Sequence, residues 1–186
     1  MFDFQRVGDM IWASADILAR GFLLGGTAGR TTLNGEGLQH QDGHSPILAS
    51  TVPCVRTYDP AFSWELAILV EYGIRRMFIE DKNELFYLMM YNEALPMPPC
   101  PDRSDLKEGI IRGGYLLEHP SGDDPRINLL GSGTIRFEVL SAASLLRDQG
   151  LSTAVYSITS FIELARDAEV SEQSTLAGVP RDAWVS

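Results

Sequence analysis

The sequence has 186 residues, about the size of one domain or slightly more; 45% of the residues are hydrophobic and 22% are charged. This balance is typical of a chain with a buried core and excludes disordered, collagen-like and fibrous proteins. The 15 Lys and Arg residues stand against 25 Asp and Glu residues, a formal net charge of -10 that repels a phosphate backbone. Nucleic acid is therefore not an expected partner.

The ends and the cysteines of the chain indicate its compartment. No apolar run approaches the roughly 20 residues of a membrane span, and the first residues lack the order of a secretory signal. Cys54 and Cys100 lie far apart, in neither a disulfide framework nor a zinc-ligand spacing. We expect a cytoplasmic protein without a membrane partner and with two reduced thiols. Because a helical pattern starts at once, we also expect the chain to begin within a domain.

The first predicted element is an amphipathic helix over about residues 4–20, capped by Asp3 and closed by Gly21. Its apolar stripe consists of Val7, Met10, Ile11, Ile17 and Leu18. From Gly21 to Gly43 the chain holds seven of its 17 glycines among polar residues, and no periodicity survives there. This composition predicts a long loop of the kind that carries function.

Regular structure resumes at residues 54–58, a short strand candidate. Asp59 and Pro60 then offer an N-cap and a proline at the first helical position. The helix that follows is expected to bury Phe62, Leu66, Leu69, Val70 and Met77. The run 85–91 is apolar without alternation, which is typical of a parallel strand buried on both faces. The aromatic residues expected to pack in the core are Phe2, Phe4, Trp12 and Trp64.

Four prolines within residues 96–101 exclude a helix or a central strand, and the domain boundary is placed there. Beyond it, residues 127–130 predict a strand and residues 131–133 a tight turn. A helix from Ile135 to about Gly150 and a strand at 154–158 follow. This order is a βαβ unit with parallel strands. Both halves therefore belong to the α/β class, with parallel sheets and flanking helices.

The turn Gly131-Ser132-Gly133 lies between a strand and a helix, as in dinucleotide-binding motifs. The sixth position of that motif is Arg136 here rather than glycine, so the fingerprint fails. A tight turn whose free amides begin the helix is the simpler interpretation. An anion on that helix N-terminus remains open.

The segment 35–45 has the richest chemistry and contains two of the three histidines, His40 and His44. Their spacing suits a metal pair on a helix, but the flanking glycines argue against a helix, so no metal ligand is assigned. The loop either hydrogen-bonds to itself or forms an active site, in which imidazoles beside carboxylates move protons or hold an oxyanion. His119 is interpreted as a solvated surface histidine.

Longer motifs resemble a known family over almost the whole chain, up to about Asp167. They are Met1–Asp9, Gly25–His40, Asp42–Ser45, Tyr58–Pro60, Tyr91–Glu93, Leu129–Thr134 and Ser157–Phe161. This pattern resembles the homodimeric pyruvate dehydrogenase E1 component of bacteria, a thiamine-diphosphate enzyme of transketolase-like fold. The resemblance implies that residues 1–98 are the later half of the pyrimidine-binding middle domain. Residues 99–107 would be a Pro-rich linker, and residues 108–186 an incomplete C-terminal domain.

The resemblance also implies roles for single residues. His40 would be the catalytic group that faces the 2-oxo acid and its cofactor adduct, and Phe2 would pack on the aminopyrimidine ring of the cofactor. Glu36, Gln39 and His44 would support the site by orienting the loop.

The implied activity is decarboxylation of pyruvate, or of another 2-oxo acid such as 2-oxobutyrate, on thiamine diphosphate with magnesium. The acyl group would pass to the lipoyl arm of E2. In the family, the diphosphate and metal ligands lie upstream of the segment, so the missing E1 domains or a second E1 chain would be partners and the isolated chain would be inactive. The alternative is a non-catalytic remnant or binding subunit. Asp3, Gln41 and Pro46 depart from the family pattern and leave the substrate open.

Overall fold

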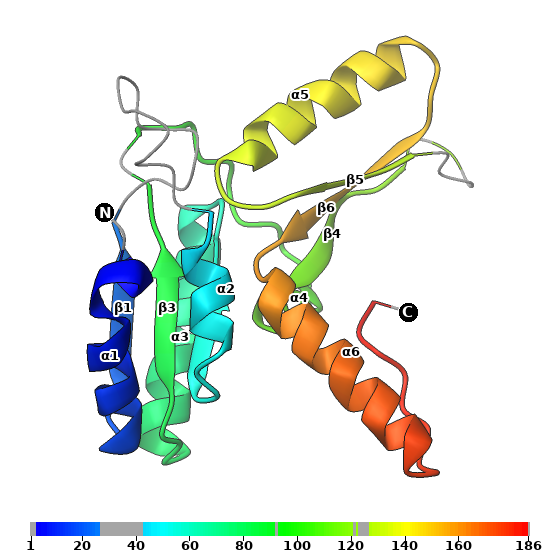
Figure 1. The fold of residues 1–186 in the computed structure, drawn as a ribbon. Helices are drawn as coiled ribbons and strands as arrows, with labels where there is room; N and C mark the ends of the chain where they lie inside the picture. Colours follow the sequence, from blue (N-terminus) through cyan, green and yellow to red (C-terminus); the bar gives the residue numbers. More distant parts are fainter. Residues whose placement is uncertain (1–2, 27–42, 92, 121, 123–126, 186) are drawn as a thin grey trace.

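The computed structural model describes residues 3–26, 43–91, 93–120, 122 and 127–185. They form two three-stranded sheets with helices on their faces (Figure 1). The first unit, residues 3–91, consists of α1 (Asp3–Asp16), β1 (Gly21–Gly25), α2 (Ser45–Ser50), β2 (Val55–Tyr58), α3 (Ser63–Ile74), the π-helical turn η2 (Arg75–Ile79) and β3 (Leu85–Met89). The second unit, residues 106–185, consists of α4 (Leu106–Arg112), β4 (Gly114–Glu118), β5 (Ile127–Gly131), α5 (Ile135–Asp148), β6 (Thr153–Ile158) and α6 (Phe161–Leu176). The predicted α/β class is confirmed.

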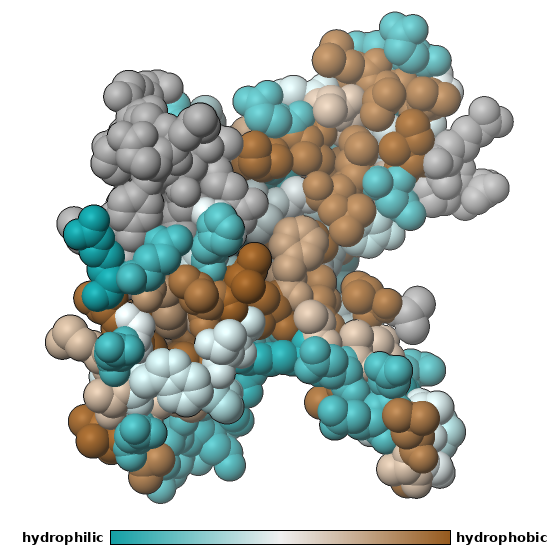
Figure 2. All heavy atoms as spheres, in the orientation of Figure 1, coloured by the Kyte–Doolittle hydropathy of each residue, from teal (hydrophilic) through white to brown (hydrophobic). Residues whose placement is uncertain are grey.

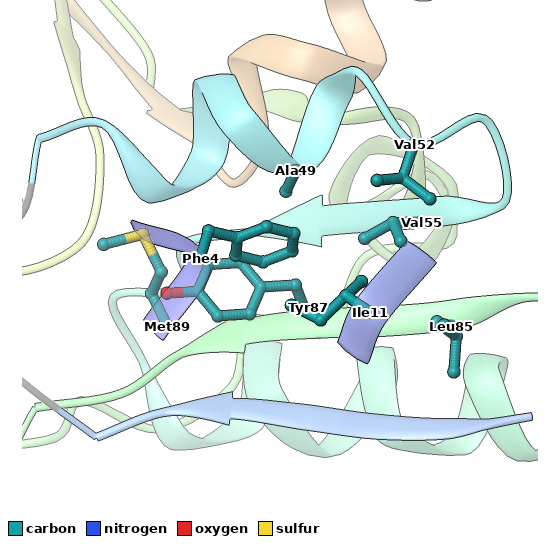
Figure 3. Packing of buried hydrophobic residues seen from close by; sticks show 8 residues of the cluster. All are labelled: Phe4, Ile11, Ala49, Val52, Val55, Leu85, Tyr87 and Met89. Carbon is teal, nitrogen blue, oxygen red and sulfur yellow. The ribbon is translucent and has the colours of Figure 1, made fainter. Parts of the chain in front are cut away.

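Strand β3 is the centre of the first sheet, and it pairs in parallel with β1 on one side and β2 on the other. Its odd-numbered residues, from Leu85 to Met89, face α1 and α2 in one buried cluster (Figure 3). Phe86 and Leu88 face the opposite side, where α3 and α4 pack. All five residues are buried. The predicted strand buried on both faces is thus confirmed, although it ends at Met89 and not at Tyr91.

The second sheet is mixed, and the expectation of a purely parallel sheet there is wrong. Strand β6 lies in the middle, parallel to β5 and antiparallel to β4. The predicted βαβ unit is present as β5, α5 and β6, but α4 and β4 were not predicted. Only residues 119–126 connect β4 to β5. This connection is shorter than the dozen or so residues that a parallel crossover needs, so β4 runs opposite to β5 and β6.

The start of the chain also differs from its prediction. Helix α1 ends at Asp16, and Gly21 begins β1 instead of closing the helix. The predicted 21–43 loop therefore starts with a strand, which forms because β3 supplies its hydrogen-bond partners. The rest of that loop, residues 27–42, lies outside the described residues.

The buried face of α1 is not the predicted stripe. Ile11 is buried as expected, and Phe4 joins it, but Met10 is 68% and Ile17 78% exposed. Val7 has non-helical backbone angles (φ -127°, ψ 15°), which interrupt the helical repeat. A face drawn from one continuous 3.6-residue period therefore turns away from the sheet. The core positions expected for the remaining apolar residues of this helix, Val7, Leu18 and Trp12, are wrong as well, since all three are exposed.

Among the described residues, the two units share a core and are joined by two ion pairs, Arg56–Glu163 and Glu71–Lys107. Leu106, Ile110 and Tyr115 of the second unit belong to the cluster on the α3 face of the first sheet. Arg56 on β2 pairs with Glu163 on α6 at 2.6 Å. A groove of about 560 Å³ runs beside this pair, and Figure 2 shows mainly hydrophilic side chains around the notch between the first unit and α6.

In the part of the chain that the structure describes, no helix has both the length and the apolar character that crossing a membrane requires. Cys54 and Cys100 are both free thiols, as expected.

Glu84 stabilises the first unit through its charge. It accepts hydrogen bonds from Arg56 at 3.0 Å and from Arg76, so β2 and η2 are held together. Burial opposes ionisation of Glu84, but the hydrogen bonds from Arg76 and Arg56 outweigh it and hold the pKa of this carboxyl below its usual value. A carboxyl with a lowered pKa stabilises the fold above its unfolded-state pKa, and this contribution is lost as the pH falls through the folded-state pKa.

We therefore predict that Glu84→Gln lowers the free energy of unfolding by about 1–3 kcal/mol at neutral pH. The difference from the parent protein should begin to shrink once the pH falls below about 4.3, the ordinary pKa of a glutamate, and should vanish below the lowered folded-state pKa of Glu84, where the parent carboxyl is protonated as well. Urea titrations of the parent and the variant, at neutral pH and in the acidic range, measure the difference in the free energy of unfolding. Glu71→Gln, which removes an exposed pair with Lys107, is the control and should change stability little. A pH-independent loss in Glu84→Gln would contradict the ionic origin.

Candidate active site

The residues predicted for the site are for the most part not described by the structure. Those outside the described residues are Phe2, Glu36, Gln39 and His40. His44 is described: it directly precedes α2, and its carbonyl oxygen accepts the amide of Leu48 at 2.9 Å. The roles of all five site residues remain predictions.

The segments that carry these residues leave from one edge of the first sheet. Phe4, two residues after Phe2, is buried, and its ring meets Tyr87 edge-on with centroids 5.0 Å apart. The Tyr87 hydroxyl lies against Gly25, the last residue of β1, since a Cβ built there would be 2.6 Å from the hydroxyl oxygen. Residues 27–42 follow Gly26 directly.

Helix α2 brings the other end of that segment back to the same place. Ala49 of α2 is buried in the cluster that contains Phe4 and Tyr87 (Figure 3). The first turn of α1, the end of β1 and the helix α2 are thus anchored to one packed cluster. In open α/β sheets, the carboxyl edge of the strands is where ligands bind. The geometry therefore makes this edge the candidate active site.

A cavity of about 210 Å³ lies beside this edge. Its lining comes from the turn after β2, the start of α3 and the segment after β3: Pro60, Phe62, Ser63, Leu66, Met89, Met90, Tyr91, Glu93 and Met97. The Tyr91 hydroxyl donates to the carbonyl oxygen of Ala61 and so joins two walls of the cavity. Burial, and then the charges of Glu65 and Asp59, raise the pKa of Tyr91, which keeps this hydroxyl protonated as a donor.

Asp59 does not cap α3, so that prediction is wrong. The helix begins at Ser63 with Phe62 at the N-cap position. The Asp59 carboxylate instead accepts a hydrogen bond from the Ser132 hydroxyl at 3.0 Å, in the turn before α5. The Asp59 carboxylate thus lies beside the turn that precedes α5, close to Gly133.

Sequence reasoning also missed Glu65 and Arg136, which are both fully buried where the two units meet. A glutamate in the first turn of a helix is a common capping residue, so its spacing gives no signal of a contact with a distant strand. In the sequence, Arg136 stands out only as the residue that breaks a glycine motif. Across the described ranges, no group of three or more His, Cys, Asp or Glu residues lies close enough to hold a metal ion.

The family described as "Pyruvate dehydrogenase E1 component middle domain" matches residues 1–98, and "Transketolase-like TK C-terminal domain" matches residues 113–183. The chain belongs to the pyruvate dehydrogenase E1 component family. It is 51% identical over 175 residues to the "Pyruvate dehydrogenase E1 component" of Pseudomonas aeruginosa, which covers 93% of this chain and 20% of the relative. It is 50% identical over 186 residues to the protein of the same name from Corynebacterium glutamicum, a match that covers 98% of this chain and 20% of the relative. The chain thus spans about a fifth of the length of these curated relatives.

Solved structures agree with the fold of this E1 segment. A transketolase from Campylobacter jejuni superposes with a TM-score of 0.66 at 18% identity, over 93% of this chain and 26% of that one. A transketolase from Leishmania mexicana superposes with a TM-score of 0.59 at 16% identity, over 75% of this chain and 19% of that one. The predicted transketolase-like fold is confirmed.

The close packing of Tyr87 on Gly25 can be tested at the two ends of β1. We expect Gly25→Ala to lower the free energy of unfolding by about 1–3 kcal/mol, because its methyl group overlaps the Tyr87 hydroxyl and ring. Gly21→Ala, at the other end of the strand, meets nothing within 4 Å and should stay within about 1 kcal/mol of the parent. Thermal unfolding of both variants measures the difference, and equal effects would contradict the packed edge.

Proposed function

We propose that this chain is part of an E1 component that decarboxylates a 2-oxo acid, pyruvate in the first place, and passes the acyl group to a lipoyl-bearing E2. The observation that carries the proposal is the anchoring of α1, β1 and α2 at one sheet edge, in a chain about 50% identical to pyruvate dehydrogenase E1 components. Residues 1–98 would be the later half of the pyrimidine-binding domain, 99–107 the linker and 108–186 an incomplete C-terminal domain. The enzyme would act as a cytoplasmic homodimer.

The described residues fit one side of a thiamine diphosphate site. Phe4, Tyr87 and Met89 form a buried apolar base at this edge. In the proposal, Phe2, two residues before Phe4, supplies a flat aromatic ring for the face of the aminopyrimidine. The diphosphate and its magnesium ion need oxygen ligands. The part of the chain that the structure describes contains no cluster that would hold the ion. We therefore assign those ligands to other E1 domains or to a second E1 chain.

Thiamine diphosphate, when bound, supplies the carbanion chemistry by which a 2-oxo acid loses carbon dioxide. In the proposal, His40 faces the 2-oxo acid, where an imidazole can donate a hydrogen bond to the substrate carboxylate and move a proton near neutral pH. Phe2 orients the cofactor ring. Glu36, Gln39 and His44 hold the loop that carries His40, and the backbone of His44 is fixed by the first turn of α2.

The experiment is a complete E1 of a relative in which residues 1–186 replace the corresponding segment. This chimaera should decarboxylate pyruvate, and His40→Ala in it should lower turnover about 10²- to 10⁴-fold, because a positioned proton-transfer group is lost. His119→Ala is the matched control, since His119 is exposed in the second unit. Full activity of the His40→Ala chimaera would show that His40 is not the proton-transfer group of the site.

We further predict that the isolated chain neither binds thiamine diphosphate tightly nor decarboxylates pyruvate, because the residues that the structure describes offer no cluster of oxygen ligands for the magnesium diphosphate. Calorimetric titration with the cofactor and magnesium, followed by a carbon dioxide assay, measures both. Tight binding would contradict the division of the site between segments. A folded but inactive chimaera would favour the non-catalytic remnant or binding subunit.

A further inference from the structure

A buried carboxylate lies where the two units meet. Glu65, in the first turn of α3, is fully buried and accepts four hydrogen bonds. Its Oε2 atom accepts the backbone amides of Ala61 at 2.6 Å and Phe62 at 3.1 Å. Its Oε1 atom accepts the hydroxyls of Tyr115 on β4 and Ser157 on β6, both at 2.6 Å. One oxygen therefore binds the first unit and the other binds the second.

The other end of the same segment is held in a similar way. The amide of Asp59 donates to the carbonyl oxygen of Thr159 at 2.7 Å, and its own carbonyl oxygen accepts the amide of Gly133 at 3.2 Å. Gly133 has a φ of +51°, and a Cβ there would lie 2.5 Å from the Asp59 carboxylate. Only glycine allows this approach. Residues 59–65, which we call the junction segment, are thus fixed at both ends by the second unit.

The junction segment is also a wall of the cavity at the candidate active site. Pro60, Phe62 and Ser63 line the cavity. Ala61 receives the hydrogen bond from Tyr91 on the opposite wall. Any displacement of this segment therefore changes the shape of the cavity and the hydrogen bond across it.

Burial of the Glu65 carboxylate costs free energy, so its presence between the two units needs a physical explanation. A carboxylate in an apolar interior costs several kcal/mol unless its oxygens are hydrogen-bonded, and a buried charge adds little net stability compared with apolar packing. Buried polar groups are best attested as devices that fix one arrangement among several. The fully buried guanidinium of Arg136 lies near Glu65 and supplies the opposite charge.

We infer that Glu65 is a positioning residue through which the second unit sets the conformation of the junction segment, and so the shape of the cavity beside the active-site edge. The inference concerns contacts within this chain and does not depend on the proposed function. A purely structural role predicts a uniform loss of stability when a partner is removed. A positioning role predicts a local change at Ala61 and Phe62 that starts from a distant residue.

The test measures amide hydrogen exchange by NMR in the full 186-residue chain. Tyr115→Phe removes one donor to Oε1 of Glu65 and leaves every residue of the junction segment unsubstituted. We expect the amides of Ala61 and Phe62 to exchange about tenfold faster, as the loss of a charged hydrogen bond implies, while the amides of β3 keep their rates. Ser157→Ala should act in the same direction through the same oxygen.

Tyr156→Phe is the matched control. Tyr156 is half-buried and precedes Ser157 on β6, so its side chain points to the opposite face of the sheet. The Tyr156→Phe variant should leave the exchange rates of Ala61, Phe62 and β3 unchanged. Unaltered exchange at Ala61 and Phe62 in Tyr115→Phe and Ser157→Ala would overturn the inference, as would an equal acceleration of Ala61, Phe62 and β3, which would show general destabilisation only. The direct substitution Glu65→Gln could unfold the chain, because it alters a buried group with four hydrogen bonds. Tyr115→Phe and Ser157→Ala test the inference without changing Glu65 itself.

Discussion

Burial of both faces of β3 is the constraint on which the rest of the structure depends. A strand with five buried residues must be covered twice, and each large apolar side chain removed from water contributes roughly 1.5–3 kcal/mol. Helices α1 and α2 cover one face and α3 covers most of the other. Leu106, Ile110 and Tyr115 of the second unit complete the packing on the α3 face of β3. The second unit is therefore part of the core of the first sheet, not an appendage to it.

The parallel pairing of β1 and β2 with β3 explains why distant segments meet at one edge. Because the three strands run in the same direction, the chain leaves each of them on the same side. The residues after β1, β2 and β3 therefore gather there, although they are separated by tens of positions in the sequence. Tyr87 stabilises this edge from within the sheet, since it contacts Phe4 and Gly25 together.

The sequence predicted those strands and helices whose own apolar pattern identifies them. The strands β2, β3, β5 and β6 and the helix α5 were predicted within a few residues. Strand β1 was missed because Gly21–Gly25 holds three apolar residues between glycines, and its partner β3 makes it a strand. Asp59 was misassigned because capping rules are local, whereas Ser132 lies 73 positions away.

The candidate site was less predictable from local pattern than the fold. The spacing of His40 and His44 left a metal pair, a self-bonded loop and an active site all open, and only the family resemblance assigned roles to Phe2 and His40. Glu65 gave no signal at all, because its partners Tyr115 and Ser157 lie 50 and 92 positions away. Contacts of this kind are set by tertiary packing, which no window of neighbouring residues contains.

Two kinds of polar contact cross between the units, and they differ in strength. The Arg56–Glu163 pair borders the groove beside α6, where the Arg56 side chain is 27% and the Glu163 side chain 9% exposed, so water reaches the pair from the side of Arg56. The Glu65 contacts are buried, and loss of one partner there leaves a charge poorly compensated in the interior, which costs several kcal/mol. Water can therefore solvate Arg56 when a contact at the groove is lost, whereas nothing replaces a lost partner of Glu65 in the interior. The contacts that shape the cavity are therefore the more costly ones to break, which favours a junction held most firmly on the side that faces the candidate active site.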